Sequence, residues 1–339
     1  MNKPKLFLLI TLSLPLIFAG SCPTPEPGPP DAGLYHTYAE IQQELQDLQN
    51  SFPSIAKVFD LGKSIQKRSI WAIKISDNVA QQEEDEPEVL FIGGHHAREW
   101  ISIDVPFLLA KHLLENYSAD EAIRNYIDNG QIWIIPLLNP DGHQYSVTTN
   151  RLWRKNRRNN GDGSFGVDLN RNYAFQWGGP GSSGDTESEI YRGPSPFSEP
   201  ESQVIRDFAN QHNFLAMISY HNFSQLVLYP WGHTNAPAPD QALLNTLAQT
   251  MADSILKVHG RRYVAQQSSD LYLASGDATD WLYGETSVPS YTIELRPTSS
   301  FPGFQLPESE IQPTFEENVP AALFLIDWSQ KGGSISTMK

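Results

Sequence analysis

The sequence predicts a single-domain α/β fold in which a central, mixed and twisted β-sheet carries helices on both faces. Two observations lead to this prediction. Apolar runs of strand length alternate along the chain with longer segments of helical periodicity. In addition, 40% of the 339 residues are hydrophobic, so the chain can bury one large core.

The expected elements follow one another along one folded domain. Ile41, Leu45 and Leu48 recur at helical spacing and predict a first helix over residues 38–50. Apolar runs predict the strands, and further helical patterns lie in the connections between them. The strands are expected at 70–75, 88–92, 132–138, 215–220 and 290–295, and two of the helices at 101–117 and 246–258. Because ligand sites of such sheets lie beyond the carboxyl ends of strands, we expect the functional residues there.

The first residues have the pattern of an export signal. Lys3 and Lys5 precede an apolar stretch at 6–18 that is too short to span a bilayer comfortably. We therefore expect residues 1–21 to be a signal peptide that is absent from the mature protein.

A single cysteine follows this segment. Cys22 comes directly after three small residues, and the arrangement resembles the lipobox of bacterial lipoproteins. We expect Cys22 to be lipidated and to anchor the protein to a membrane of a bacterial envelope. Residues 22–34, which are rich in proline, are then a tether, 35–330 the folded domain and 331–339 a tail. The alternative is an ordinary secretory peptide, which would give a secreted protein.

The chain is acidic, with a formal net charge of −15 at pH 7. Nucleic-acid-binding proteins normally carry a basic face, so we expect no nucleic-acid partner. The same charge would not hold the protein on an anionic membrane, so any membrane attachment must come from lipid.

Three residues could form a metal centre. His96 and Glu99 follow a glycine pair at the end of a predicted strand, where a tight turn can aim both side chains at one point, and His221 ends another predicted strand. Catalytic zinc takes three protein ligands of the His or carboxylate type and keeps a fourth position for water. A His and a Glu three residues apart are common by chance, so this spacing alone is a weak indication. His95 is expected to point elsewhere and to pack or support the ligands.

Seven segments, in this order, resemble the motifs of the zinc metallocarboxypeptidases of the pancreatic A/B type and the bacterial T type. They read HAREW (96–100), NPDG (139–142), RLWRKNR (151–157), GVDLNRN (166–172), YHNFSQ (220–225), LYLASGD (271–277) and TIELR (292–296). The resemblance covers nearly everything from Tyr35 to Trp328. It implies a monomeric peptide hydrolase that removes single residues from the C-termini of peptides and proteins, with one zinc ion per chain.

The resemblance also implies roles for individual residues. His96, Glu99 and His221 would hold the zinc, and Glu294 would be the general base for the zinc-bound water. This fits the chemistry, because zinc lowers the pKa of water to about 7, where a carboxylate can take its proton. The alternative for Glu294 is a strand-end carboxylate paired with Arg296.

Arg154 would stabilise the oxyanion that develops on the scissile carbonyl. It belongs to the one basic stretch of this acidic chain, residues 151–158, whose other charges are expected to be solvated. Arg98 would extend the cationic path of the substrate. Asp168 would accept a hydrogen bond from a zinc-bound histidine and fix its tautomer.

Asn170 and Arg171 resemble the family's clamp on the terminal carboxylate of the substrate, which a guanidinium can bind in bidentate fashion. An internal peptide bond offers no such carboxylate, so the clamp implies an exopeptidase. Tyr272 would cap the bound residue and help to exclude water.

The specificity pocket has an unusual base. The family position that separates apolar from basic preference is Thr279 here, and Asp277 stands two residues before it. This pair resembles the T type and implies that both apolar and basic C-terminal residues are accepted, with Asp277 pairing a terminal Lys or Arg.

Two other functions remain open at this point. One is a related zinc amidohydrolase that acts on cell-wall peptides or acyl-amino acids, and the other is a non-catalytic surface lipoprotein that binds peptide ends. The carboxylate clamp and Tyr272 favour the peptidase over the first. The presence of every metal ligand and of Glu294 favours it over the second.

Overall fold

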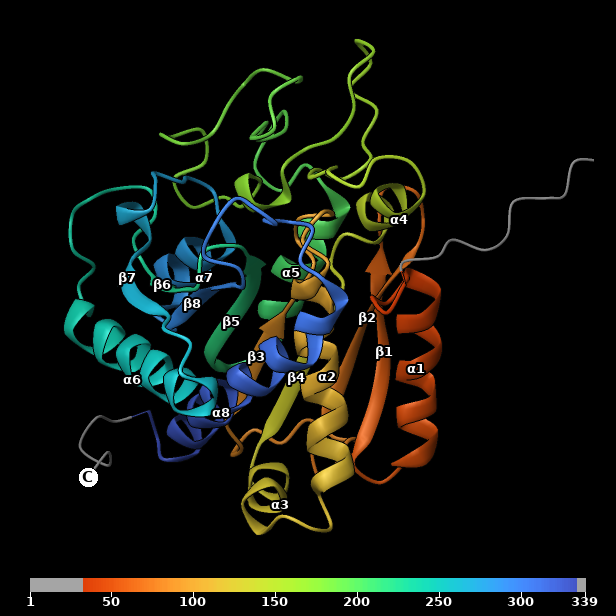
Figure 1. Ribbon diagram of the computed structural model, residues 1–339, viewed down its shortest axis with the longest axis vertical. Coiled ribbons are helices and arrows are strands. Elements are labelled where there is room, and N and C mark those ends of the chain that lie inside the picture. Colours follow the sequence, from red (N-terminus) through yellow and green to blue (C-terminus); the bar gives the residue numbers. More distant parts are fainter. Residues whose placement is uncertain (1–32, 334–339) are drawn as a thin grey trace, which may run out of the picture.

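A computed structural model describes residues 33–333 of the chain (Figure 1). An eight-stranded mixed sheet forms its centre, with the strand order β1-β2-β4-β3-β5-β8-β6-β7. The strands are β1 (Ala56–Lys63), β2 (Ser69–Ile75), β3 (Glu88–Ile92), β4 (Gln131–Ile135), β5 (Phe214–Asn222), β6 (Leu226–Tyr229), β7 (Val264–Gln267) and β8 (Ser290–Leu295). The predicted single-domain α/β fold with a mixed sheet is confirmed.

Helices cover both faces of this sheet. They are α1 (Tyr38–Ser51), α2 (Ile101–Asn116), α3 (Glu121–Asp128), α4 (Pro140–Thr148), α5 (Pro200–Ala209), α6 (Gln241–His259), α7 (Ala278–Thr286) and α8 (Ile311–Gln330). Short 3-10 turns stand at Leu169–Arg171, Ser268–Asp270 and Glu308–Glu310. Among residues 33–333, none of the helices combines the length and the apolar composition that a membrane span requires.

Strand β3 shows how the two faces are built. Val89 and Phe91 point into a core shared with α1, α2, α3, α6 and α8, whereas Leu90 and Ile92 point into a second core shared with α5 and α7. Successive side chains of a strand alternate between faces, so a strand that is apolar throughout must be covered on both sides. This is why the continuous apolar runs identified these strands.

The observed elements differ from the predicted ones in several bounds and in three strands. Helix α6 begins at Gln241 rather than at residue 246, and strand β5 extends to Asn222 rather than to residue 220. Strand β4 ends at Ile135 rather than at residue 138, because Pro136 has no N–H to continue the ladder. The patterns also did not single out β1, β6 and β7. β1 has a mostly half-exposed pattern at one sheet edge, β7 is half-exposed at the other, and β6 is only four residues long.

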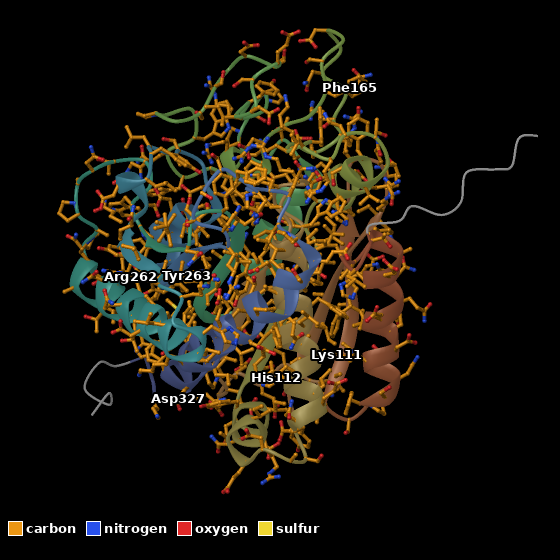
Figure 2. The ribbon with its side chains drawn as sticks, viewed as in Figure 1. Lys111, His112, Phe165, Arg262, Tyr263 and Asp327 are labelled. Atoms are coloured by element: carbon orange, nitrogen blue, oxygen red, sulfur yellow. The ribbon has the colours of Figure 1, made fainter. Side chains whose placement is uncertain are left out.

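The central strands β4, β3, β5 and β8 are parallel to one another, so their carboxyl ends meet at one edge. The long connection between α4 and α5 lies over one end of the molecule, at the top of Figure 1. Phe165 belongs to this connection and lies near its outer limit in Figure 2.

The predicted N-terminal segments lie largely outside the described residues. This holds for the signal peptide at 1–21, for Cys22 and for the tether except Gly33 and Leu34. Of the predicted tail, only residues 331–333 are described.

Candidate metal centre and active site

Two neighbouring strand ends bring the three predicted metal ligands together. After β3, Gly94 adopts a φ of +66°, a left-handed conformation that glycine tolerates best, and the chain turns so that His96 and Glu99 face inward. His221 lies near the end of β5, which pairs directly with β3. All three side chains are at most 3% exposed.

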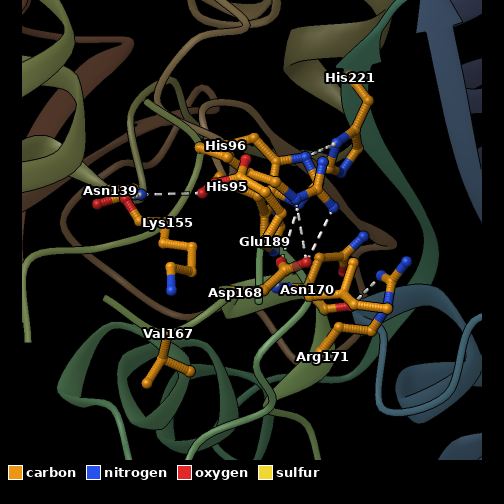
Figure 3. Close-up of polar contacts among 12 residues, drawn as sticks. His95, His96, Asn139, Lys155, Val167, Asp168, Asn170, Arg171, Glu189 and His221 are labelled. Atoms are coloured by element: carbon orange, nitrogen blue, oxygen red, sulfur yellow. Dashed lines mark hydrogen bonds and ion pairs between the residues drawn. The ribbon is translucent and has the colours of Figure 1, made fainter. Parts of the chain in front are cut away.

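The ligand atoms converge on one point, and Figure 3 shows the contact between His96 and His221. Nδ1 of His96 lies 2.9 Å from Oε1 of Glu99, and Nδ1 of His221 lies 3.0 Å from Oε2 of Glu99 and 3.1 Å from Nδ1 of His96. Two imidazole nitrogens and a carboxylate that face one another in a buried spot form the donor set of catalytic zinc. The residues therefore fit a zinc ion.

Asp168 contacts the first of these ligands, His96, at the ring nitrogen that does not face Glu99. Its Oδ1 lies 3.0 Å from Nε2 of His96, and its Oδ2 accepts hydrogen bonds from Nε and Nη2 of Arg154 at 3.1 and 2.9 Å. A hydrogen bond from Nε2–H to Asp168 leaves the Nδ1 lone pair of His96 for the metal.

Charge compensation keeps the buried carboxylates of this centre ionised. Burial by itself raises the pKa of Glu99, but His96 and His221 hold it well below its usual range. For Asp168, burial is likewise outweighed by Arg154 and His96, which hold its pKa well below its usual range. Both groups are therefore anionic at neutral pH.

Glu294 stands beside this triad on strand β8, where it pairs in register with His221 of β5. It is 8% exposed and lines a cavity of about 530 Å³ together with His96, Glu99, Arg154 and Arg171. Burial and the neighbouring Glu99 raise the pKa of Glu294 well above its usual range, against the influence of Arg154 and Arg171. A bound cation would favour the carboxylate form.

The alternative reading of Glu294 as a partner of Arg296 finds no support. Arg296 instead donates from Nε to Oε1 of Glu317 at 2.9 Å and forms further ion pairs with Glu317 and Glu310. Glu294 is thus left facing the cavity.

Arg171 and Asn170 border the same cavity system. Arg171 is 2% exposed, and its Nε and Nη1 donate to the carbonyl oxygens of Gly181 and Asn170 at 2.8 and 2.6 Å. The Asn170 Oδ1 accepts from the N–H of Ala278 at 3.0 Å. Tyr272 is 50% exposed and its ring centre lies 5.9 Å from the Arg171 guanidinium, so it stands at the mouth of the cavity.

A second, smaller cavity continues from this point and contains both predicted specificity residues. The Oδ1 of Asp277 accepts from the Thr279 hydroxyl at 2.6 Å and from the Asp280 N–H at 2.8 Å. Its Oδ2 is buried and makes no hydrogen bond. Burial and the charge of Asp280 raise the pKa of Asp277 to about 7. Asp280 itself is held by the backbone N–H groups of Gly232 and His233.

Arg98 lies on the outer side of the larger cavity. Its Nη1 forms a 3.0 Å ion pair with Glu189, and its guanidinium stacks over the ring of Phe304 at 4.2 Å. Glu189 and Phe304 were not among the predicted residues, because neither has a motif that distinguishes it from an ordinary loop residue.

The prediction that most charges of residues 151–158 are solvated is wrong. Arg151 stacks 3.6 Å over Trp100, Arg157 stacks 3.7 Å over Tyr145, and Lys155 is only 3% exposed. Aromatic faces and backbone carbonyls replace water around these cations. His95, which precedes the metal ligand His96, packs as expected, since it is fully buried and stacks on His221 with 5.4 Å between ring centres.

Comparison with known proteins agrees with this geometry. The family model described as zinc carboxypeptidase matches residues 41–321. Carboxypeptidase B of Astacus astacus is 38% identical over 289 residues, which are 84% of this chain and 93% of that protein. Carboxypeptidase A2 of Rattus norvegicus is also 38% identical, over 286 residues that cover 84% of this chain and 67% of the relative.

A solved structure shares the fold as well. Carboxypeptidase A from Helicoverpa armigera superimposes with a TM-score of 0.81 and 31% identity, covering 88% of this chain and 74% of that one. Of the three functions that the sequence leaves open, the family assigns the peptidase. The chain belongs to the zinc carboxypeptidase family and is a zinc-dependent exopeptidase that hydrolyses the C-terminal peptide bond of its substrates.

Proposed function

We propose that this carboxypeptidase has broad specificity and releases both apolar and basic C-terminal residues. The observation that carries the proposal is the position of Asp277 in a small cavity that continues from the metal centre, with one unpartnered carboxylate oxygen. Thr279 lies beside it and adds no charge. An ionised Asp277 can pair a terminal Lys or Arg, and a protonated one can tolerate an apolar side chain.

We propose that Arg171 and Asn170 bind the terminal carboxylate of the substrate. Arg171 is anchored through Nε and Nη1 to backbone carbonyls, which preorganises its guanidinium at the junction of the two cavities. Tyr272 covers this junction and excludes water once a substrate is bound. Arg98, paired with Glu189, contacts the residues upstream of the scissile bond.

The catalytic step is assigned to Glu294 and Arg154. Zinc bound by His96, Glu99 and His221 would supply an activated water and a Lewis acid for the scissile carbonyl. Glu294 accepts the proton of the attacking water and delivers it to the leaving amine. Arg154, fixed by Asp168, donates to the oxygen on which negative charge develops.

The location remains a further proposal. The N-terminal pattern of residues 1–21 supports an exported protein, and Cys22 supports a lipid anchor in a bacterial envelope; without acylation the protein is secreted. We also propose that the enzyme works as a monomer. Mass spectrometry of the mature N-terminus of protein made with its full leader separates acylated Cys22 from an unmodified end.

The test of the function is amino-acid release from N-blocked dipeptides that end in Phe, Leu, Arg or Asp. We expect the zinc-loaded protein to release Phe, Leu and Arg, a zinc chelator to stop the release, and Arg154→Ala to lower kcat about 100-fold or more. Release of apolar residues alone would overturn the broad specificity. A fully active Arg154→Ala enzyme would overturn the assigned oxyanion role.

A further inference from the structure

We propose that Asn156 is a positioning residue, which fixes Arg154 and Asp168 relative to each other and to the metal ligands. The inference rests on the roles proposed above for Arg154 and Asp168. Asn156 contacts neither the metal ligands nor the cavity, so it acts through the chain segments that carry these side chains.

The backbone around Asn156 joins three functional segments. The N–H of Ala97, next to His96, donates to the carbonyl of Arg154 at 2.9 Å. On the other side, the N–H of Asn156 donates to the carbonyl of Val167 at 3.0 Å. Residues 154–156 therefore lie between the loop of the metal ligands and the loop that carries Asp168.

A second asparagine holds the first of these junctions. The Nδ2 of Asn139 donates to the carbonyl of His95 at 3.1 Å and to that of Lys155 at 3.2 Å. Figure 3 shows the bond to His95, with Lys155 nearby. The junction between residues 95–97 and 154–156 is thus fixed by hydrogen bonds from Ala97 and Asn139.

The side chain of Asn156 holds the second junction and uses all of its hydrogen-bonding capacity. Its Oδ1 accepts from the N–H groups of Val167 at 2.8 Å and Arg158 at 3.2 Å. Its Nδ2 donates to Oε2 of Glu199 at 2.7 Å and to Oε2 of Glu201 at 3.2 Å. An amide offers two acceptor and two donor sites, so Asn156, which is 0% exposed, is fully satisfied.

Glu199 and Glu201 connect the Asn156 amide to the beginning of helix α5. Glu199 is the N-cap residue of α5 and Glu201 lies in the first turn of that helix, where negative charge is favoured. Oε1 of Glu199 also accepts from Arg158 at 2.9 Å, and Oε1 of Glu201 accepts from the N–H of Ile65 at 2.9 Å. Both are 0% exposed, so they hold Asn156 in one place.

The position of Asn156 therefore sets the spacing of the catalytic groups. Arg154 lies two residues before Asn156. Asp168 directly follows Val167, whose backbone carbonyl accepts the hydrogen bond from the Asn156 N–H. A displacement of about 1 Å in a catalytic group can cost about 100-fold in rate. Loss of the Asn156 amide should therefore reduce catalysis more than substrate binding.

The test begins with Asn156→Asp in the zinc-loaded enzyme. The variant loses both amide donors and places a third carboxylate against Glu199 and Glu201. We expect kcat to fall about 10- to 100-fold with KM changed less than about twofold. A phosphonate dipeptide analogue resembles the tetrahedral intermediate, and its oxygens are expected to bind Arg154. Its affinity should therefore fall by the same factor as kcat/KM. Free phenylalanine, which uses the Arg171 clamp, should bind as in the wild type.

A rescue variant separates positioning from general damage. In Asn156→Asp with Glu199→Gln, the new amide can donate to the new carboxylate, and at least about tenfold of the lost kcat should return. Both variants are assayed at one pH above 7, because burial raises the pKa of Glu201 to about 7 and its protonated form could itself donate to the new carboxylate and mask the loss in the single variant. If Asn156→Asp does not fold, Asn156→Ser retains one donor without added charge and should show the same loss confined to kcat.

Asn318→Asp is the matched control. Asn318 is 1% exposed and its amide donates to the Thr314 carbonyl within α8, so its variant should lose stability but keep kcat.

Equal losses in kcat and in phenylalanine affinity, or no rescue, would overturn the inference. If Arg154→Ala lowers kcat and neither Asn156 variant does, only the inference fails; if Arg154→Ala has no effect, the proposed oxyanion role fails first.

Discussion

Replacement of Asp277 by asparagine should convert a broad carboxypeptidase into one that prefers apolar C-termini. The substitution keeps the size of the side chain and an oxygen that can cap α7, as Oδ1 of Asp277 does through the Asp280 N–H at 2.8 Å. Only the charge is removed. The oxygen that changes, Oδ2, is the one that is buried without a partner in the small cavity.

The size of the effect follows from the burial of this carboxylate. Asp277 is 5% exposed, so a bound Arg side chain would face it away from bulk water. Removing one partner of a buried ion pair costs about 3–5 kcal/mol, which corresponds to a loss of about two to four orders of magnitude in kcat/KM for Arg release. Release of Leu should change by less than about threefold, because no charge faces that side chain.

The assay compares kcat/KM for N-blocked dipeptides that end in Arg and in Leu over a series of pH values. Ionisations of the catalytic groups affect both substrates and cancel in the ratio. Because burial and Asp280 raise the pKa of Asp277 to about 7, the wild-type preference for Arg should rise as the pH increases through 7. In Asp277→Asn this rise should disappear.

The control is Asp240→Asn, an equal change of charge at an exposed residue before α6, and it should leave the ratio unchanged. Two results would refute the reasoning. One is an Asp277→Asn enzyme that still releases Arg at the wild-type rate. The other is an equal loss for Arg and Leu, which would indicate damage to the pocket rather than a lost charge.

Three further predictions concern the proposed base Glu294, the partner of a metal ligand, Asp168, and the buried carboxyl group of Glu201. Glu294→Gln should lower kcat by about 100-fold or more and keep the zinc content, because Glu294 is not a ligand; metal loss would contradict this. Asp168→Asn should weaken zinc binding about 10- to 100-fold in competition with a chromophoric chelator, since His96 loses its charged partner, and unchanged affinity would refute that role. Burial, followed by repulsion from Glu199, raises the pKa of Glu201 from 4.5 to about 7, so its contribution to stability is complete below pH 4.5 and is lost as the pH rises to about 7. Chemical denaturation should reveal a fall of about 3 kcal/mol in the free energy of unfolding over that range, which Glu201→Gln should remove and which an unaltered pH profile would disprove.

Much of the site could be predicted because its chemistry restricts residue choice. A zinc ligand must be one of a few residue types, so His96, Glu99 and His221 stood out within their motifs, and the structure brings them together. The clamp role of Arg171 was implied by the family resemblance and stays a proposal. The positioning residues did not stand out in this way. Asn156, one of the most connected side chains near the site, is in sequence only another polar residue in a basic stretch.

The sequence by itself determined the class of fold, the central strands and the types of residue that meet at their ends. Apolar runs suffice to locate strands β3, β5 and β8, because helices cover both faces of the sheet and nearly every position of these strands is buried. Tertiary structure alone decided the edge strands β1 and β7, whose half-exposed residues gain stability only from pairing with a neighbour. It also decided which side chains meet: His96 and His221 are 125 residues apart, and Glu199 reaches Asn156 across 43. Contacts of this kind depend on how the strands pair and on how loops pack over their ends, which no local pattern of residues specifies.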